Sequence, residues 1–207
     1  FDDVDGYSKI EEKLDSYKIV QSFSEVTLLG KDSDRGEYRR SVTKVALENS
    51  MKPYNTKSSS YLDLSPHNAT GFSWGVQREL VEKYRIYNHW ITGSYDIAFV
   101  IAIWADWENQ FFNRLNDNMK EHYFDWAMPF YNYVNVNVTC LDGHIRHLWH
   151  GQRNYKKRWK CLKDYNPYSD VAVVSSGALE WTSDKPDLHL CCRNMCLNYD
   201  KDFKIII

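Results

Sequence analysis

Short strand patterns alternate with helical patterns along almost the whole chain, and no repeat or low-complexity tract interrupts them. Residues 7–17 carry apolar side chains at helical spacing, and a short strand pattern follows at 18–23. The same order returns further along, where a strand pattern at 71–76 precedes a helical pattern at 77–85. This mixture of helices and strands predicts an α/β fold.

Two longer helical patterns occupy the middle of the chain. Residues 92–107 include an almost uninterrupted apolar run, which predicts a mostly buried helix capped at its N-terminus by Ser94. The next pattern places Phe111, Leu115 and Met119 on one face of a helix. We therefore expect both segments to contribute to the core.

The stretch from Gly30 to Ser60 is charged, rich in serine and weakly periodic. A chain of 207 residues is long enough to bury a core of ordinary size. We expect a single domain over residues 1–207, with residues 30–60 as a weakly ordered insertion or loop.

Acidic and basic side chains nearly balance, 28 against 26, so no whole-protein field favours nucleic acid or a membrane surface. No apolar run approaches the roughly 18 residues that a membrane-spanning helix needs. The first residues, FDDVDGYSKIEEKL, are polar and lack the basic start of a signal peptide. These features predict a cytoplasmic protein without a membrane span.

The five cysteines are an odd number without the spacing of a disulfide framework, which predicts a reducing compartment. The run CCRNMC, residues 191–196, suggests a zinc site, but no partner cluster at C-x-x-C spacing accompanies it. The favoured alternative is that these cysteines simply lie on a C-terminal helix that Ser183 caps.

The segment GHIRHLWHGQRNYKKRW, residues 143–159, holds three of the seven histidines. The preceding run, Val134–Cys140, alternates valine with polar residues, and the Asp-Gly that follows predicts a tight hairpin turn. His144, His147 and His150 should therefore lie on the return strand, where residues at odd spacing point to opposite faces. Two of them can share a metal site only where the strand ends.

A helix start rich in cations follows these histidines, and it contains Arg153 and Lys156. Free N–H groups at a helix N-terminus and positive side chains together favour a diphosphate, and imidazole and carboxylate together suit Mn²⁺ bound beside it. The alternative is an amphipathic helix with a solvated basic face, and this segment taken alone favours that alternative.

Two further groups could carry chemistry. Asp96 follows a turn at Gly93, and it could act as a general base toward a hydroxyl, although an acidic residue there also stabilises the helix dipole. Gly71 allows the backbone to approach a ligand closely, and Trp74 with Arg78 could form a stacking wall. Core packing explains Trp74 equally well.

Taken in order, these groups resemble the C-terminal half of a GT-A-fold glycosyltransferase, of the nucleotide-sugar-dependent type common in phages and large DNA viruses. LDSYKIVQSFSEV is similar to their ekYdvVQlFs segment and GFSWGVQREL to their Gly-x-x-Trp-x-x-x-Arg element. GSYDIAF is similar to their Gly-Gly-x-Asp element, with Ser94 in place of the second glycine. GHIRHLWHGQRNYKKRW resembles their Gly-x-x-x-His-x-x-His-Gly signature, the most specific part, and YNPYSDVAVVSSGALEW their FDPxxDlxxxxxGvlew tail. The resemblance spans nearly the whole chain outside residues 30–60.

The resemblance implies a GT-A-like mixed sheet flanked by helices, and transfer of a sugar from a nucleoside diphosphate, UDP favoured, to a hydroxyl of a glycan or other acceptor. Asp96 would be the general base, and His147 or His150, but not His144, would be the protein ligand of Mn²⁺ or Mg²⁺. The diphosphate would be bound by Arg153 and Lys156. The sugar or acceptor pocket would be formed by Gly71, Trp74, Arg78 and Gly93.

Enzymes of this kind bind the metal chiefly through an Asp-x-Asp motif just ahead of the segment where this sequence starts. Asp3 and Asp5 have that spacing but follow the phenylalanine that ends the family motif, so we expect them on a loop without metal. The resemblance therefore implies that the chain lacks the N-terminal nucleotide-binding strands of its own domain, which would supply most of the donor affinity.

Three other interpretations stay open. A carbohydrate- or nucleotide-binding module without turnover would use the aromatic and histidine side chains as a surface. A zinc-stabilised scaffold would use histidine and cysteine ligands and would unfold when the metal is removed. Nucleic-acid binding at residues 153–163 is the weakest interpretation, because the formal net charge is only −2.

Overall fold

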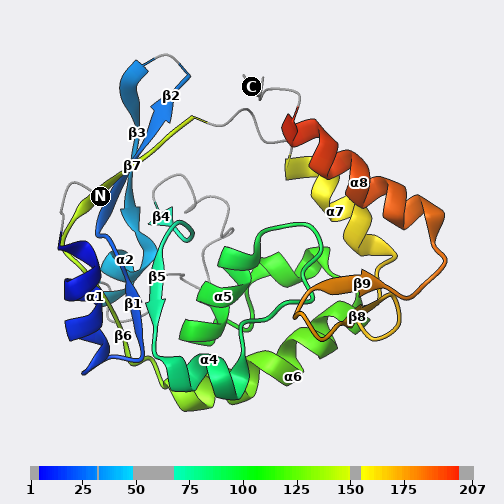
Figure 1. Cartoon of the computed structure of the whole chain (residues 1–207), viewed down its shortest axis with the longest axis horizontal. Helices are drawn as coiled ribbons and strands as arrows, with labels where there is room; N and C mark the ends of the chain where they lie inside the picture. The colour runs from blue at the N-terminus through cyan, green and yellow to red at the C-terminus, as the bar shows by residue number, and fades with distance from the viewer. Residues whose placement is uncertain (1–4, 32, 49–67, 150–154, 201–207) are drawn as a thin grey trace. The chain divides into compact units, whose positions relative to one another are not determined.

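The computed structural model describes residues 5–31, 33–48, 68–149 and 155–200. Helices and strands alternate along these ranges, so the protein is of the mixed α/β class, as predicted (Figure 1). None of the helices in these ranges is long and apolar enough to cross a membrane.

The chain divides into two compact units, each with its own packing. The first unit combines Phe1–Ile86 with Asp96–Asn109 and Ala127–Trp149. The second unit combines Tyr87–Tyr95 and Gln110–Trp126 with the residues from His150 onward. The expectation of one domain over the whole chain stays a prediction.

The first unit contains a three-stranded sheet with β1 (Ile19–Gln21) at its centre. β5 (Trp74–Val76) pairs with β1 antiparallel, and β6 (Val138–Cys140) pairs with it parallel. α1 (Gly6–Leu14) packs directly on β5 because Gly75 leaves room for it. A Cβ at Gly75 would lie only 2.4 Å from a side-chain atom of α1. The helix and the strands expected in this part of the sequence are therefore present.

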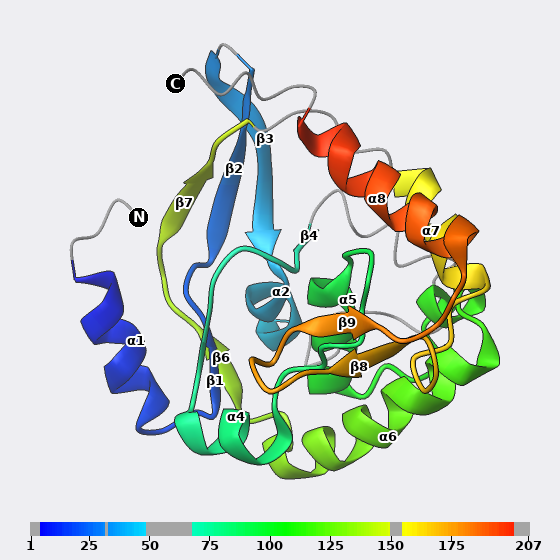
Figure 2. The same ribbon diagram turned by 45° about the vertical axis from the view of Figure 1, so that its right-hand side comes forward.

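The first unit also contains a four-stranded sheet with the order β4-β3-β2-β7. β2 (Glu25–Gly30) and β3 (Ser33–Ser41) form a long antiparallel hairpin, with β7 (His144–His147) parallel to β2 on its other side (Figure 1, Figure 2). β4 (Asn68–Ala69) pairs parallel with the end of β3. The core beneath this sheet includes Phe23 and side chains from three of its strands.

Residues 30–60, predicted to be a weakly ordered insertion or loop, contain regular secondary structure in the part that the structure describes. Residues 33–48 form β3 and α2 (Val42–Glu48), while residues 49–60 lie outside the described ranges. Much of β3 is exposed and is held by backbone pairing with β2 rather than by burial. Because few of its side chains enter the core, the sequence lacks the alternation of apolar and polar residues that predicts a strand.

The hairpin expected around Asp142 and Gly143 is wrong. β6 pairs with β1 and β7 pairs with β2, so the chain continues past Asp142 alongside the first strands instead of turning back. The connection between β6 and β7 lies beside the connection between β1 and β2. There the Ser24 N–H donates to the Gly143 carbonyl (3.0 Å), and the Gly143 N–H donates to Ser24 Oγ (3.1 Å). A type I′ turn needs positive φ at both central residues, and neither Asp142 nor Gly143 has it.

Two further helices follow in the first unit, α4 (Arg78–Tyr84) and α5 (Tyr95–Trp104). Every side chain from Ala98 to Trp104 is buried, as the apolar run predicts. Ser94 has a left-handed φ of 73°, which is not the extended backbone of an N-cap residue, so its predicted capping role is wrong.

In the second unit, η1 (Gln110–Arg114) precedes α6 (Asp117–Val134), which runs on into the first unit. Phe111, Leu115 and Met119 are all buried, as their spacing predicts. These side chains join a core that is rich in aromatic rings.

Asn116 joins the start of α6 to the end of α7 (Tyr155–Lys163). Its Oδ1 accepts a hydrogen bond from the Met119 N–H at 2.9 Å, which makes Asn116 an N-cap residue. Its Nδ2 donates to three carbonyl oxygens at the end of α7, those of Leu162 (3.0 Å), Lys163 (3.1 Å) and Tyr165 (2.7 Å). One side chain therefore satisfies backbone groups of two helix ends.

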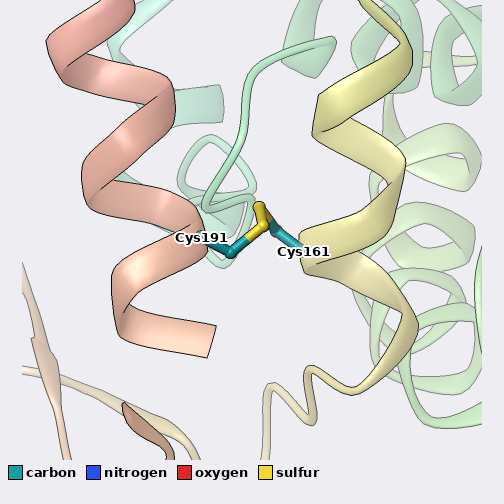
Figure 3. Close-up of a disulfide and its surroundings, with 2 residues drawn as sticks. All are labelled: Cys161 and Cys191. Atoms are coloured by element: carbon teal, nitrogen blue, oxygen red, sulfur yellow. A yellow bond between two sulfur atoms is a disulfide. The ribbon is translucent and has the colours of Figure 1, made fainter. Parts of the chain in front are cut away.

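A disulfide between Cys161 and Cys191 links α7 to α8 (Pro186–Asp200), with 5.7 Å between the two Cα atoms (Figure 3). The cysteines of residues 191–196 lie on this C-terminal helix, as the favoured alternative predicts. The helix begins at Pro186, three residues beyond Ser183, so Ser183 does not cap it. The predicted reducing, cytoplasmic compartment stays a prediction, and this bond counts against it.

β8 (Val171–Val173) and β9 (Leu179–Trp181) form an antiparallel hairpin anchored by Asp170. The Asp170 carboxylate is buried, and its Oδ2 accepts hydrogen bonds from the Asn166 N–H (2.7 Å) and from Lys185 Nζ (2.8 Å). Burial by itself would raise the pKa of Asp170, but the bonds from Lys185 and Asn166 outweigh it and hold the pKa below its ordinary value. The YNPYSD segment therefore has a clear structural role.

Candidate functional site

Asp96 lies in the first turn of α5, behind a turn with an unusual backbone. Gly93 has a φ of 83° and Ser94 a φ of 73°, so two successive residues are left-handed. Glycine adopts this region without strain, whereas a serine there is disfavoured by about 1 kcal/mol. Gly93 therefore shapes the entry to α5.

The Asp96 carboxylate meets the loop that follows β4. The Thr70 hydroxyl donates a hydrogen bond to Asp96 Oδ2 at 2.8 Å, and Thr70 itself is buried. Gly71 lies beside the same oxygen, and a Cβ added at Gly71 would be 3.0 Å from it. The sequence-predicted pair Gly71 and Asp96 is thus brought together, because the absence of a side chain lets the loop approach the carboxylate.

Trp74 packs beside this contact rather than forming an open wall. Its indole Nε1 donates to the Thr70 carbonyl at 3.1 Å, and its ring meets the edge of Phe99 with centroids 5.5 Å apart. Trp74 is half-buried, so its described contacts agree with the packing alternative. Arg78 is the exposed first residue of α4.

His147 lies at the end of β7 and contacts the same loop through Phe72. The two rings are 4.7 Å apart, centroid to centroid, in an edge arrangement. Phe72 has a φ of 78°, is 44% exposed, and also meets the buried Phe23 ring at 5.8 Å. A bulky residue with positive φ is rare, and such strain clusters at functional sites.

Thr70 and Phe72 are the residues of this site that sequence reasoning missed. They flank Gly71 in the sequence, so their position next to a predicted site residue is the one sequence feature that could have identified them. His144 differs from His147, since its Nε2 lies 2.8 Å from the Thr27 hydroxyl within the sheet.

The structure does not place the side chains of the predicted metal ligand His150 or of the predicted diphosphate-binding residues Arg153 and Lys156. His150 and Arg153 are outside the described residues, and Lys156 belongs to α7 in the second unit, with only its backbone described. Over the described ranges no group of three or more histidine, cysteine, aspartate or glutamate side chains could hold a metal ion. His147 is therefore the one predicted ligand that the structure describes.

Polar side chains gather where β1 ends. Gln21 is fully buried and its Nε2 donates to the Ala69 carbonyl at 3.0 Å, which fixes the strand that leads into Thr70. Ser22 and Ser24 follow and are also buried. Ligands of α/β proteins bind beyond the carboxyl ends of the strands, and the loop of Thr70, Gly71 and Phe72 lies near this end of β1.

Comparison of the chain with protein-family models, with curated proteins and with solved structures gives no match.

Proposed function

We propose that the first unit carries the acceptor side of a glycosyltransferase site, which moves a sugar from a nucleoside diphosphate, UDP favoured, to an acceptor hydroxyl. One observation carries the proposal: Gly71 lies against the Asp96 carboxylate, and the next residue, Phe72, contacts the His147 ring. Three stretches of sequence that resemble glycosyltransferase motifs thus meet at one loop. The left-handed Gly93-Ser94 turn supports the likeness too, because a Gly-Gly pair suits that backbone.

Asp96 is the general base of this proposal. Its Oδ2 accepts the hydrogen bond from Thr70, and its Oδ1 takes the proton of the acceptor hydroxyl. As that proton moves, the acceptor oxygen bonds to the anomeric carbon and the bond from this carbon to the diphosphate oxygen breaks. The electron pair of the broken bond leaves with the nucleoside diphosphate, and Asp96 later returns its proton to water.

The charge that develops on the anomeric carbon is positive, as in glycoside hydrolysis. A carboxylate close to the incoming hydroxyl therefore serves twice, as proton acceptor and as a stabilising negative charge. The exposed Phe72 ring beside Gly71 offers an apolar face to a bound sugar.

His147 is the described residue of the donor side of the proposal, and the resemblance offers His150 as the alternative metal ligand. A Mn²⁺ or Mg²⁺ ion bound there would neutralise charge on the leaving diphosphate. Such ions keep few protein ligands and take the others from phosphate and water, so His147 would be one nitrogen ligand among mostly oxygen ligands. The resemblance assigns the diphosphate to Arg153 and Lys156, whose positive charge suits that group.

The test uses the whole chain with Mn²⁺, a mixture of methyl glycosides as acceptors, and UDP-glucose, UDP-galactose or UDP-N-acetylglucosamine as donor. The donor is supplied at concentrations high enough to offset the weak donor affinity expected of a chain without the N-terminal nucleotide-binding strands. Released UDP is measured. Metal-dependent release that rises with acceptor concentration supports transfer. Saturable binding of UDP without release supports a nucleotide- or carbohydrate-binding module instead, and absence of both contradicts the proposal.

A further inference from the structure

Thr70 is held firmly from both sides. It is 8% exposed and comes directly after β4. The carbonyl before it, that of Ala69, accepts a hydrogen bond from Gln21, and its own carbonyl accepts one from the Trp74 indole. The Thr70 hydroxyl therefore reaches Asp96 from a backbone that cannot shift freely.

We infer that Thr70 is a positioning residue for the Asp96 base, an inference that rests on the proposed function. The χ2 torsion of an aspartate is broad, so a carboxylate in a first helical turn rotates readily. The 2.8 Å bond from Thr70 selects one orientation, in which Oδ2 lies against Gly71 and Oδ1 is the oxygen that meets the acceptor. A hydrogen bond to an ionised group is among the stronger ones, which suits this role.

Gly71 enforces the same orientation by a different means. Since a Cβ there would lie 3.0 Å from Oδ2, a larger residue would press on the carboxylate that Thr70 holds. Thr70 and Gly71 thus fix the position of the Asp96 carboxylate together, Thr70 by its hydrogen bond and Gly71 by leaving space for it.

A purely structural role is the alternative, because the same bond ties the loop to α5. The two roles differ in what a variant changes. If the bond only stabilises the fold, activity and stability should fall together. If Thr70 positions the base, kcat should fall while KM for the acceptor stays the same, and a side chain that keeps the hydroxyl should restore it.

The experiment compares Thr70→Val, which removes the hydroxyl and keeps a similar shape, with Thr70→Ser, which keeps the hydroxyl. Thr43→Val is the matched control, because Thr43 is fully buried and its hydroxyl has no hydrogen-bond partner in the described part of the chain. UDP release with the best of the three UDP-sugars gives kcat and KM, and thermal melting gives stability. Crystal structures of the variants give the Asp96 side-chain orientation.

We expect Thr70→Val to lower kcat on the order of 10²-fold at unchanged acceptor KM, since a small misplacement of a reacting group has effects of that size. Asp96 should then occupy more than one orientation. Thr70→Ser and Thr43→Val should behave like the wild-type chain. If Thr70→Val does not fold, Thr70→Ala takes its place.

The inference is overturned if the variant without the hydroxyl keeps the wild-type Asp96 orientation, or if Thr70→Ser loses as much kcat as Thr70→Val. A wild-type chain that releases no UDP refutes the proposed function. In that case the Asp96 orientation still decides whether Thr70 positions this side chain, so the two failures are distinguishable.

Discussion

The imidazole rings of His89 and His122 lie 4.3 Å apart, centroid to centroid, within the second unit. Buried Tyr87 contacts both rings, and its hydroxyl is 3.1 Å from Nδ1 of His122. Burial, with His122 adding to it, lowers the pKa of His89 to about 4. Burial also lowers the pKa of His122, although Asp125 raises it in part. The pair is therefore neutral near pH 7.

The second unit should lose stability in mild acid. An unfolded histidine titrates near pH ~6.5, whereas folded His89 takes up its proton only near pH 4. Between these values the unfolded state binds more protons, so the free energy of unfolding falls as the pH falls through this window. His89→Asn should flatten that pH dependence in urea unfolding followed by tryptophan fluorescence. An unchanged slope would assign the acid effect to other groups.

Asn116→Ala should destabilise the second unit by about 1–3 kcal/mol, because it removes an N-cap and leaves carbonyl oxygens of α7 without their partner. Denaturant unfolding measures the loss. Asn132→Ala is the control, since Asn132 is exposed on α6 and its loss should change stability by less than about 0.5 kcal/mol. Equal effects of the two substitutions would contradict the capping role.

Opening the disulfide should also weaken the second unit. Cys161 and Cys191 are 30 residues apart, and a crosslink of that length stabilises a fold by about 3–4 kcal/mol through the entropy of the unfolded chain. Unfolding midpoints with and without a reductant test this, and the double variant Cys161→Ser, Cys191→Ser should match the reduced chain. A wild-type unfolding midpoint that is the same with and without the reductant would contradict the disulfide between Cys161 and Cys191.

Ser94→Gly should stabilise the chain by up to about 1 kcal/mol, because a left-handed φ of 73° strains serine but not glycine. Gly93→Ala should act in the opposite direction and by about 1 kcal/mol or more, since the φ of Gly93 is 83°. The melting temperatures of both variants, compared with that of the wild-type chain, test these two expectations. A destabilising Ser94→Gly would show that the serine side chain contributes more than its backbone strain removes.

Sequence patterns predicted the elements that depend on near neighbours. The apolar run from Ala98 to Trp104 predicted a buried helix because helical contacts join residues three and four apart. The hairpin at Asp142 and Gly143 failed because the chain there pairs with a segment 119 residues earlier in the sequence, at Ser24. No local pattern reports such a partner.

The candidate site shows the same limit. The resemblance singles out Gly71 and Asp96, which do lie together, but Thr70 belongs to none of the resembling motifs and only the structure shows its bond to Asp96. The resemblance implies a pocket role for Trp74, whereas its described contacts are those of packing, the alternative that composition favours equally. A tryptophan in a sequence does not reveal which of its faces is covered.

Asp96→Asn is the most direct test of the proposed transfer reaction, and Asp117→Asn is its matched control. Each aspartate lies in the first turn of its helix, so both substitutions remove the same favourable interaction with the helix dipole. The measurement is the acceptor-dependent rate of UDP release from a UDP-sugar with Mn²⁺ present. We predict a loss of about 10²- to 10⁴-fold for Asp96→Asn, the usual contribution of a general base, and no loss for Asp117→Asn. Full activity of Asp96→Asn would contradict the account.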